Sequence, residues 1–177
     1  MPDSLTATII KDNRVDAQLD AQLRALLYES FPKDNTFRDR RYWKEIPAQR
    51  AILRDASGQL AGNVAIHRKI LGTSTGDLLI GGIADVCVRK DCRGRGFVRA
   101  MLTEVHNFLN KGDYPFAMLF GDRLVYSSSG YVNIDNPIRY VDDDGQQISK
   151  VFDYAMIRPI RAQHWPAGEI DLRGPLF

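Results

Sequence analysis

The sequence predicts an α/β (α+β) fold in which helices flank a mixed, mostly antiparallel central sheet. Strand-like and helix-like runs alternate along the 177 residues, turn-forming segments separate the strands, and no shift in composition marks a linker. A chain of this length buries about 70% of the surface that it exposes when unfolded. We therefore expect a single domain, residues 1–177, with one core.

The first half of the chain reads as one helix followed by three strands. Apolar residues recur at intervals of three and four from Asp16 to Phe31, which predicts an amphipathic helix that Pro32 closes. Apolar runs at 50–54, 60–71 and 78–88, with turn-forming residues at 55–58 and 73–77 between them, predict an antiparallel meander.

The second half begins with a longer helix. From Phe97 the apolar residues share one face until Gly112, which suits a left-handed helix cap, and a buried strand over 114–120 follows. Asp122 has the character of an N-cap for a short helix that reaches Ser129 and ends at Gly130. Two further strands, 138–141 and 151–159, are expected on either side of the turn at 142–145.

Composition limits the classes of partner. Lysine and arginine number 24 against 22 aspartate and glutamate, a formal net charge of +2, which is too small and dispersed for a general nucleic-acid surface. No apolar run approaches the roughly 20 residues that span a bilayer, and the N-terminus lacks the features of a secretory signal. Cys87 and Cys92 match neither a disulfide framework nor a zinc pattern. We expect a soluble, cytoplasmic protein with free thiols, no metal, no membrane span and no nucleic-acid partner; a homodimer remains open.

The segment VRKDCRGRGFVRAML, residues 88–102, is the most informative. A strand ends at Val88, a glycine-containing loop follows, and a helix starts at about residue 96 or 97. The first N–H groups of a helix have no intrahelical acceptor and lie at the positive end of its dipole, so this junction suits a phosphate. Gly94 and Gly96 allow close backbone approach, and Arg93 and Arg95 add charged donors.

Two common phosphate motifs do not fit this junction. A dinucleotide fingerprint, Gly-x-Gly-x-x-Gly, would require glycine where Arg99 stands, and a P-loop would require Gly-Lys-Ser/Thr, which is absent.

The loop instead resembles the acyl-CoA pyrophosphate loop of the GNAT (GCN5-related) N-acyltransferases, whose pattern is Gln/Arg-x-x-Gly-x-Gly/Ala. Arg93 and Gly96 match its first two fixed positions, whereas Val98 stands where glycine or alanine is usual. Downstream, Leu124-Val-Tyr126-Ser-Ser-Ser-Gly130-Tyr131 is similar to the family's x-x-Tyr-x-x-x-Gly-aromatic segment. The resemblance covers about residues 20–177.

Two subfamilies look most similar. The rhizobial nodulation N-acyltransferase resembles the chain at residues 49–52, from 77 to 96 and at 165–168, and the aminoglycoside 2'-N-acetyltransferases resemble it at 88–102 and 126–131. These subfamilies act on a glycan amine and an aminoglycoside amine, so the resemblance implies an amino sugar as the first candidate acceptor. Protein N-termini, lysines and polyamines remain alternatives.

The resemblance implies an N-acyltransferase that moves an acetyl or longer acyl group from acyl-CoA to a primary amine of a small molecule. In this family a tyrosine in the position of Tyr126 acts as the general acid, and an acidic residue on or near the strand acts as the base, for which we choose Asp85. The backbone of the strand end, where the strand splays from its neighbour, would hold the pantetheine and thioester. The residues implied for acyl-CoA binding are Val86, Cys87, Val88, Arg93, Gly94, Arg95, Gly96, Phe97 and Val98.

Strict strand alternation puts Asp85 and Cys87 on one face, although a bulge would reverse the phase partway along. His67 is an alternative base, while His106, His164 and both cysteines read as structural. The tail from Trp165 to Asp171 reads as a segment packed on the sheet, with an acceptor-pocket wall as the alternative.

Two other functions remain open. One is a non-catalytic acyl-CoA sensor that uses the same loop. The other is a protein or nucleic-acid binding domain that uses Arg93 and Arg95, against which the near-neutral charge argues.

Overall fold

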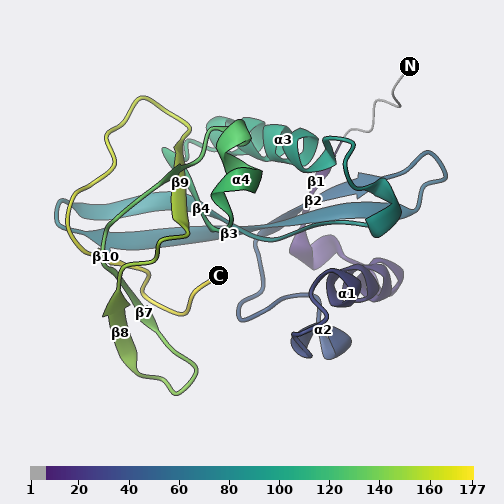
Figure 1. The fold of residues 1–177 in the computed structure, drawn as a ribbon, viewed down its shortest axis with the longest axis horizontal. Helices are drawn as coiled ribbons and strands as arrows, with labels where there is room; N and C mark the ends of the chain where they lie inside the picture. The colour runs from purple at the N-terminus through teal and green to yellow at the C-terminus, as the bar shows by residue number, and fades with distance from the viewer. Residues whose placement is uncertain (1–6) are drawn as a thin grey trace. The chain divides into compact units, whose positions relative to one another are not determined.

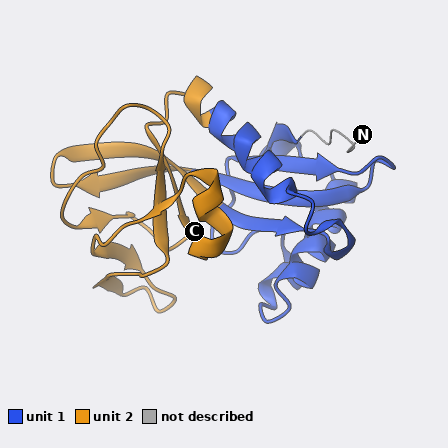
Figure 2. Ribbon diagram, turned by 45° about the horizontal axis from the view of Figure 1, so that its top comes forward, with its two compact units in different colours: residues 1–67, 84–108 blue, residues 68–83, 109–177 orange. Residues whose placement is uncertain are grey.

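The computed structural model describes residues 7–177, which form two compact units. The first unit contains the residues up to His67 and those from Ala84 to Phe108; the second contains Arg68–Ile83 and Leu109–Phe177 (Figure 2). Strands β3 (Leu60–Thr73) and β4 (Gly76–Val88) and helix α3 (Phe97–Lys111), which are labelled in Figure 1, each contribute residues to both units. The mixed α/β fold is confirmed, and the single-domain organisation stays a prediction.

The first unit starts with an edge of antiparallel strands. Strand β1 (Thr8–Lys11) pairs with β2 (Gln49–Arg54), which pairs with the N-terminal half of β3. Between β1 and β2 lie the 3₁₀ turn η1 (Asp12–Arg14), helix α1 (Ala17–Ser30) and helix α2 (Thr36–Asp39). Helix α1 begins where the sequence predicts, because the Asp16 carboxylate accepts a hydrogen bond of 2.8 Å from the Leu19 N–H.

Helix α1 packs its apolar stripe on one face of these strands. Its four buried leucines form a core cluster with Phe37 of α2, Ile52 of β2, Leu60 of β3 and Cys87 of β4. On the opposite face, a Cβ atom at Gly62 would lie 2.9 Å from the Met101 sulfur, so glycine lets α3 approach the sheet. Helices therefore cover both faces of the sheet within this unit.

The second unit is built on the other halves of β3 and β4. Strand β4 pairs in parallel with β5 (Phe116–Phe120), which pairs antiparallel with β9 (Ala155–Pro159), and β6 (Val132–Asn133) closes that side. Beyond β3, the short β10 (Ile170–Asp171) pairs antiparallel with β3 and parallel with β7 (Ile138–Val141), which forms a hairpin with β8 (Gln147–Lys150) (Figure 1). Helix α4 (Arg123–Tyr126) and turn η3 (Ser127–Ser129) follow β5.

The expected strand over 151–159 is confirmed only at 155–159, which form β9, because 151–154 form a loop. The strand that follows the turn after β7 is β8, which was not expected. Phe152 is buried in this loop, with ring centroids 5.4 Å from Phe120 and 5.7 Å from Tyr140. A buried aromatic residue beside an exposed Val151 imitates strand alternation. Strands β1, β6 and β10, helix α2 and the short 3₁₀ turns η1 and η2 (Lys90–Cys92) were not expected either.

Candidate functional site

A cavity of about 620 Å³ opens in the first unit where α1 leads into α2. Its apolar walls are Phe31, Pro32, Phe37 and Trp43, and its acidic groups are Asp34 and Asp85. Lys33 and Ser30 complete the lining. The Ser30 hydroxyl is buried, and among residues 7–177 no group meets it with normal hydrogen-bond geometry. It does interact with the Cys87 thiol, and it opposes the rise that burial causes in the pKa of that thiol.

Asp85 projects from β4 into this cavity and has an unusual backbone. Its φ of 50° lies in the left-handed region, which is sparsely populated by residues other than glycine, asparagine and aspartate. Burial raises the pKa of the Asp85 carboxyl to about 6, although the charge of Arg50 opposes the rise. The raised pKa brings this carboxyl group closer to neutrality than an ordinary aspartate.

Asp85 and Cys87 both turn toward the side of the sheet that carries α1. Cys87 lies in the α1 core cluster, and Asp85 lines the cavity together with Phe37 of the same cluster. The ladder between β4 and β5 ends at the Ile83–Leu119 pair, so the strand end at 84–88 lies beyond it. Within this segment Val86 is partly exposed, whereas Cys87 and Val88 are buried.

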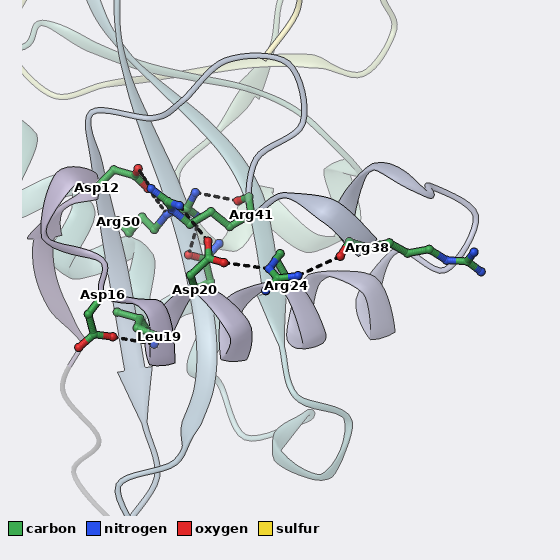
Figure 3. A network of polar contacts seen from close by, with 9 residues as sticks. Asp12, Asp16, Leu19, Asp20, Arg24, Arg38, Arg41 and Arg50 are labelled. Atoms are coloured by element: carbon green, nitrogen blue, oxygen red, sulfur yellow. Dashed lines mark hydrogen bonds and ion pairs between the residues drawn. The ribbon is translucent and has the colours of Figure 1, made fainter.

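A polar network centred on Arg50 leads through Asn63 to the backbone at Asp85. Figure 3 shows its contacts among Asp12, Arg41 and Arg50. The Arg50 side chain is fully buried; it donates to Asp12 (2.6 Å), to the Asn63 side-chain oxygen (3.2 Å) and to the Arg41 carbonyl (2.7 Å). Asn63 in turn donates 2.9 Å to the Asp85 carbonyl oxygen. Sequence reasoning missed this network because Arg50 and Asn63 stand in strand runs where single polar residues are ordinarily exposed.

The glycine-containing loop combines left-handed backbone angles with open space at the start of α3. Gly94 and Gly96 have φ values of 73° and 76°, and a Cβ atom at either position would meet nothing within 4 Å. The first intrahelical bond of α3 runs from the Ala100 N–H to the Gly96 carbonyl (3.0 Å), which leaves the N–H groups of the preceding helical residues without helical acceptors. The open space beside both glycines lies at this helix terminus.

The two arginines of the loop differ in their contacts. Arg93 donates from Nε to the Val88 carbonyl (3.0 Å), which ties the loop back to the strand end. Arg95 is exposed. A third arginine, Arg89, holds the start of the loop through Asp91 (2.7 Å), Asp55 (2.7 Å) and the Leu60 carbonyl (3.1 Å). The hydrogen bonds with the Asp91 and Asp55 carboxylates raise the pKa of Arg89.

Tyr126 lies in the second unit, on the short helix that the sequence predicts. The Asp122 carboxylate accepts from the Leu124 N–H (2.8 Å) at the start of this helix, and Gly130, with φ 84°, ends the following turn. The Tyr126 ring packs edge-on against Tyr131 at 6.0 Å, and a side chain at Gly121 would collide with it. Packing therefore fixes the ring while leaving the residue partly exposed.

Other candidate groups have structural surroundings. Both cysteines are free and buried, and burial raises the pKa of the Cys87 thiol to about 12, which opposes a nucleophilic role. His67 and His106 are buried. Residues 7–177 contain no cluster of histidine, cysteine and carboxylate groups able to hold a metal ion, and no helix among them is both long and apolar enough to cross a bilayer.

The tail belongs to the fold of the second unit. Trp165 donates from its indole N–H to Asn136 (2.9 Å) and packs edge-on against Phe116. Glu169 pairs with Arg139 and accepts from the Ser149 hydroxyl (2.6 Å). These contacts agree with the interpretation of the tail as a segment packed on the sheet.

Several solved structures share this fold. The GNAT family N-acetyltransferase YhbS from Escherichia coli, solved in complex with CoA, is 20% identical with a TM-score of 0.65 and covers 97% of this chain and 92% of its own. A GNAT family acetyltransferase from Brucella melitensis, solved with acetyl-CoA, is 15% identical with a TM-score of 0.62 and covers 93% and 94%. GCN5 from Tetrahymena is 10% identical with a TM-score of 0.61 and covers 90% and 99%.

The sequence comparisons give the family. No curated protein matches the chain. The family model described as an acetyltransferase (GNAT) domain matches residues 10–133, which include the cavity, the strand end, the glycine-containing loop and Tyr126. The chain therefore belongs to the GNAT acetyltransferase family.

Proposed function

We propose that this chain transfers an acetyl group from acetyl-CoA to the primary amine of a small molecule. The observation that carries the proposal is Asp85, a carboxyl group with a pKa of about 6 that lines a cavity immediately before the strand end at 86–88. A general base works best when its pKa lies near the operating pH. Asp85 meets that condition.

The glycine-containing loop is the proposed seat of the donor. The free N–H groups at the start of α3, the open space beside Gly94 and Gly96, and the exposed Arg95 offer donors and positive charge to a pyrophosphate. The pantetheine arm would follow the backbone of Val86–Val88, as the family resemblance implies. One lone pair of the Val88 carbonyl already accepts from Arg93, so the pantetheine would share this oxygen.

The proposed reaction is direct attack. Asp85 takes a proton from the ammonium group, directly or through water, and the amine nitrogen then forms a bond to the thioester carbonyl carbon. The carbon–sulfur bond then breaks, and Tyr126 donates its proton to the departing CoA thiolate. The positively charged nitrogen of the intermediate loses a proton, which returns to Tyr126. This assigns the base to Asp85 and the acid to Tyr126.

Calorimetric titration with acetyl-CoA is the first test. We expect saturable binding that weakens at least about tenfold in an Arg93→Ala/Arg95→Ala variant, because each charged hydrogen bond contributes about 1.5–3 kcal/mol. The single variant Arg95→Ala keeps the contact between Arg93 and the Val88 carbonyl. Weaker acetyl-CoA binding in this variant would therefore come from the lost arginine charge and not from a loosened loop. Arg14→Ala/Arg54→Ala, which removes the same charge from exposed positions outside the loop, is the control. A chain that binds no acyl-CoA would overturn the proposal.

Turnover separates an enzyme from an acyl-CoA sensor. Release of CoA thiol should require an amine and should slow in Tyr126→Phe, with acetyl-CoA affinity unchanged. Binding of acetyl-CoA with no turnover on small amines, amino sugars, lysine peptides or peptide N-termini would favour the sensor. Comparing acetyl-CoA with longer acyl-CoA donors in the same assay gives the acyl-chain preference.

A further inference from the structure

The cavity of the first unit carries information about the acceptor that the sequence did not. Resting on the proposed function, we propose that the acceptor is a small ammonium compound with an apolar, preferably aromatic, body. The ammonium group lies between Asp34 and Asp85, and the body lies against Phe31, Phe37 and Trp43. This preference differs from the amino sugar that the family resemblance implies.

The two carboxylates define where a positive charge binds. Asp34 and Asp85 line the same cavity, and the charge of Asp34 is close enough to raise the pKa of Asp85. Asp34 is fixed in place because its carboxylate accepts from the Thr36 N–H (2.9 Å). An ammonium ion between two carboxylates relieves their mutual repulsion and presents its proton to Asp85.

The remaining walls suit an apolar body. Phe31 and Phe37 lie with ring centroids 5.7 Å apart, and both line the cavity together with Pro32 and Trp43. The Lys44 ammonium already lies 4.4 Å from the centre of the Trp43 ring. The ring therefore acts toward the ligand as an apolar wall, while the carboxylates bind the cation.

An amino sugar fits these walls less well. Each hydroxyl of a buried sugar needs a hydrogen-bond partner, because an unsatisfied one costs about 1–3 kcal/mol. Apart from the two carboxylates, the polar side-chain groups of the lining are the Ser30 hydroxyl, the Lys33 ammonium and the Trp43 indole N–H, and the rest of the lining is apolar. A volume of about 620 Å³ falls within the range of small-molecule sites.

A steady-state assay of CoA release at saturating acetyl-CoA tests this proposal. The probes are 2-phenylethylamine, glucosamine and a lysine peptide. We expect kcat/KM for 2-phenylethylamine to exceed that for each of the other two amines by at least about tenfold. A substrate that lacks one favourable contact with the site loses about 1.4 kcal/mol, which corresponds to this factor. In calorimetry on the CoA-saturated chain, 2-phenylethylamine should bind and its neutral counterpart 2-phenylethanol should bind at least about tenfold more weakly.

Two variants locate the acceptor. Asp34→Asn keeps an oxygen that accepts from the Thr36 N–H but removes the charge, so KM for 2-phenylethylamine should rise about tenfold with little change in kcat. Trp43→Ala should raise the same KM by a similar factor. The matched controls are Asp39→Asn, an exposed carboxylate at the end of α2, and Tyr42→Ala, an aromatic neighbour outside the cavity lining. Both should leave KM unchanged.

The outcomes separate the two proposals. If glucosamine or the peptide is the better substrate, or if KM is insensitive to Asp34→Asn, the acceptor inference is overturned while the acyltransferase stands. If acetyl-CoA does not bind, the proposed function fails, and the calorimetric titration detects that without any acceptor. Thermal unfolding of each variant identifies a change that merely loosens the fold.

Discussion

Asn63 links the fully buried Arg50 to the backbone of Asp85. Its side-chain oxygen accepts from Arg50 at 3.2 Å, and its side-chain nitrogen donates to the Asp85 carbonyl at 2.9 Å. The contact holds β4 where its backbone enters the left-handed region, with φ 50° at Asp85. Asn63 thus positions the proposed base without contacting the acceptor cavity itself.

Asn63→Ala should lower both stability and activity. The change leaves a buried Arg50 donor and the Asp85 carbonyl without their partner, which costs about 1–3 kcal/mol of unfolding free energy. We also expect a lower kcat and a changed pH profile, because the Asp85 backbone loses its support. Denaturant unfolding and a pH–rate profile measure the two effects. A variant that loses stability but keeps the wild-type pH profile would show that Asn63 is only structural.

The pH dependence of catalysis should report Asp85. Because its pKa is raised to about 6 by burial, kcat/KM should increase with pH and level off above about pH 6 to 7. Asp85→Asn should lower kcat by roughly 10²–10⁴-fold and remove this limb of the profile. Asparagine also tolerates a positive φ, so the backbone is preserved. An unchanged rate in the variant would exclude Asp85 as the base.

The same substitution should stabilise the fold at high pH. A carboxyl group whose folded pKa is raised stabilises the protein below its unfolded pKa of about 3.9, and this contribution is lost as the pH rises through about 6. Asp85→Asn should therefore increase the unfolding free energy by about 1–2 kcal/mol near pH 8 and by less near pH 5, a range reduced for the partial exposure of the group. Urea titrations at both pH values decide this. If Asp85→Asn increased the unfolding free energy more near pH 5 than near pH 8, the pKa of Asp85 would not be raised in the folded protein.

Local chemistry made parts of the fold predictable. The cap at Asp122 and the exit at Gly130 follow from short-range hydrogen bonds and positive φ, and each appears where the sequence places it. The periodicity also places the start of α1 correctly, although the cap at Asp16 was not predicted. Strands β6 and β10, two residues each, carry no periodicity, because pairing with neighbouring strands alone creates them. Residues 151–154 show the converse case. Phe152 is buried although this segment pairs with no strand, so its burial pattern alone led to the wrong prediction of a strand there.

The site was predictable only in part. The loop and the choice of Asp85 came from local sequence and family resemblance, and their roles stay predictions. The cavity was not visible because Trp43 and Asp34 lie far along the chain from Asp85 and in segments without a periodic pattern. Arg50 carried no signal either, because only its contacts with Asp12 and Asn63 distinguish it from an exposed strand residue.

Alanine substitutions at Gly96 and Gly58 distinguish an effect on acetyl-CoA binding from the cost of a strained backbone. Gly96 and Gly58 both have positive φ, at 76° and 81°, and neither would place a Cβ atom within 4 Å of another group. Alanine at either position should therefore cost about 1 kcal/mol of stability, mainly from the left-handed backbone. Only Gly96→Ala should also weaken acetyl-CoA binding, because its Cβ fills space at the start of α3. Equal acetyl-CoA affinity in the two variants would argue against a phosphate at this helix terminus.

The buried Arg50–Asp12 pair should make the stability of the first unit depend on pH. Arg50 and Asp12 meet at 2.6 Å with side chains 0% and 3% exposed. Although burial opposes it, hydrogen bonds from Arg41 and Arg50 lower the pKa of Asp12. The pair therefore stabilises the fold above the unfolded pKa of about 3.9, and this contribution is lost as the pH falls through the lower folded value.

Arg50→Met tests that ion pair, because it leaves Asp12 buried with Arg41 as its remaining partner. We expect a loss of about 3 kcal/mol in unfolding free energy near pH 7, at the lower end of the range for breaking a buried pair. Arg24→Met is the matched control: its pair with Asp20 is an i,i+4 contact with side chains 35% and 26% exposed, so its removal should cost at most about 0.5 kcal/mol. The difference between the two losses should narrow as the pH is lowered, because protonation of Asp12 removes the attraction that Arg50 supplies. Similar losses at pH 7 would mean that Arg50 contributes packing alone.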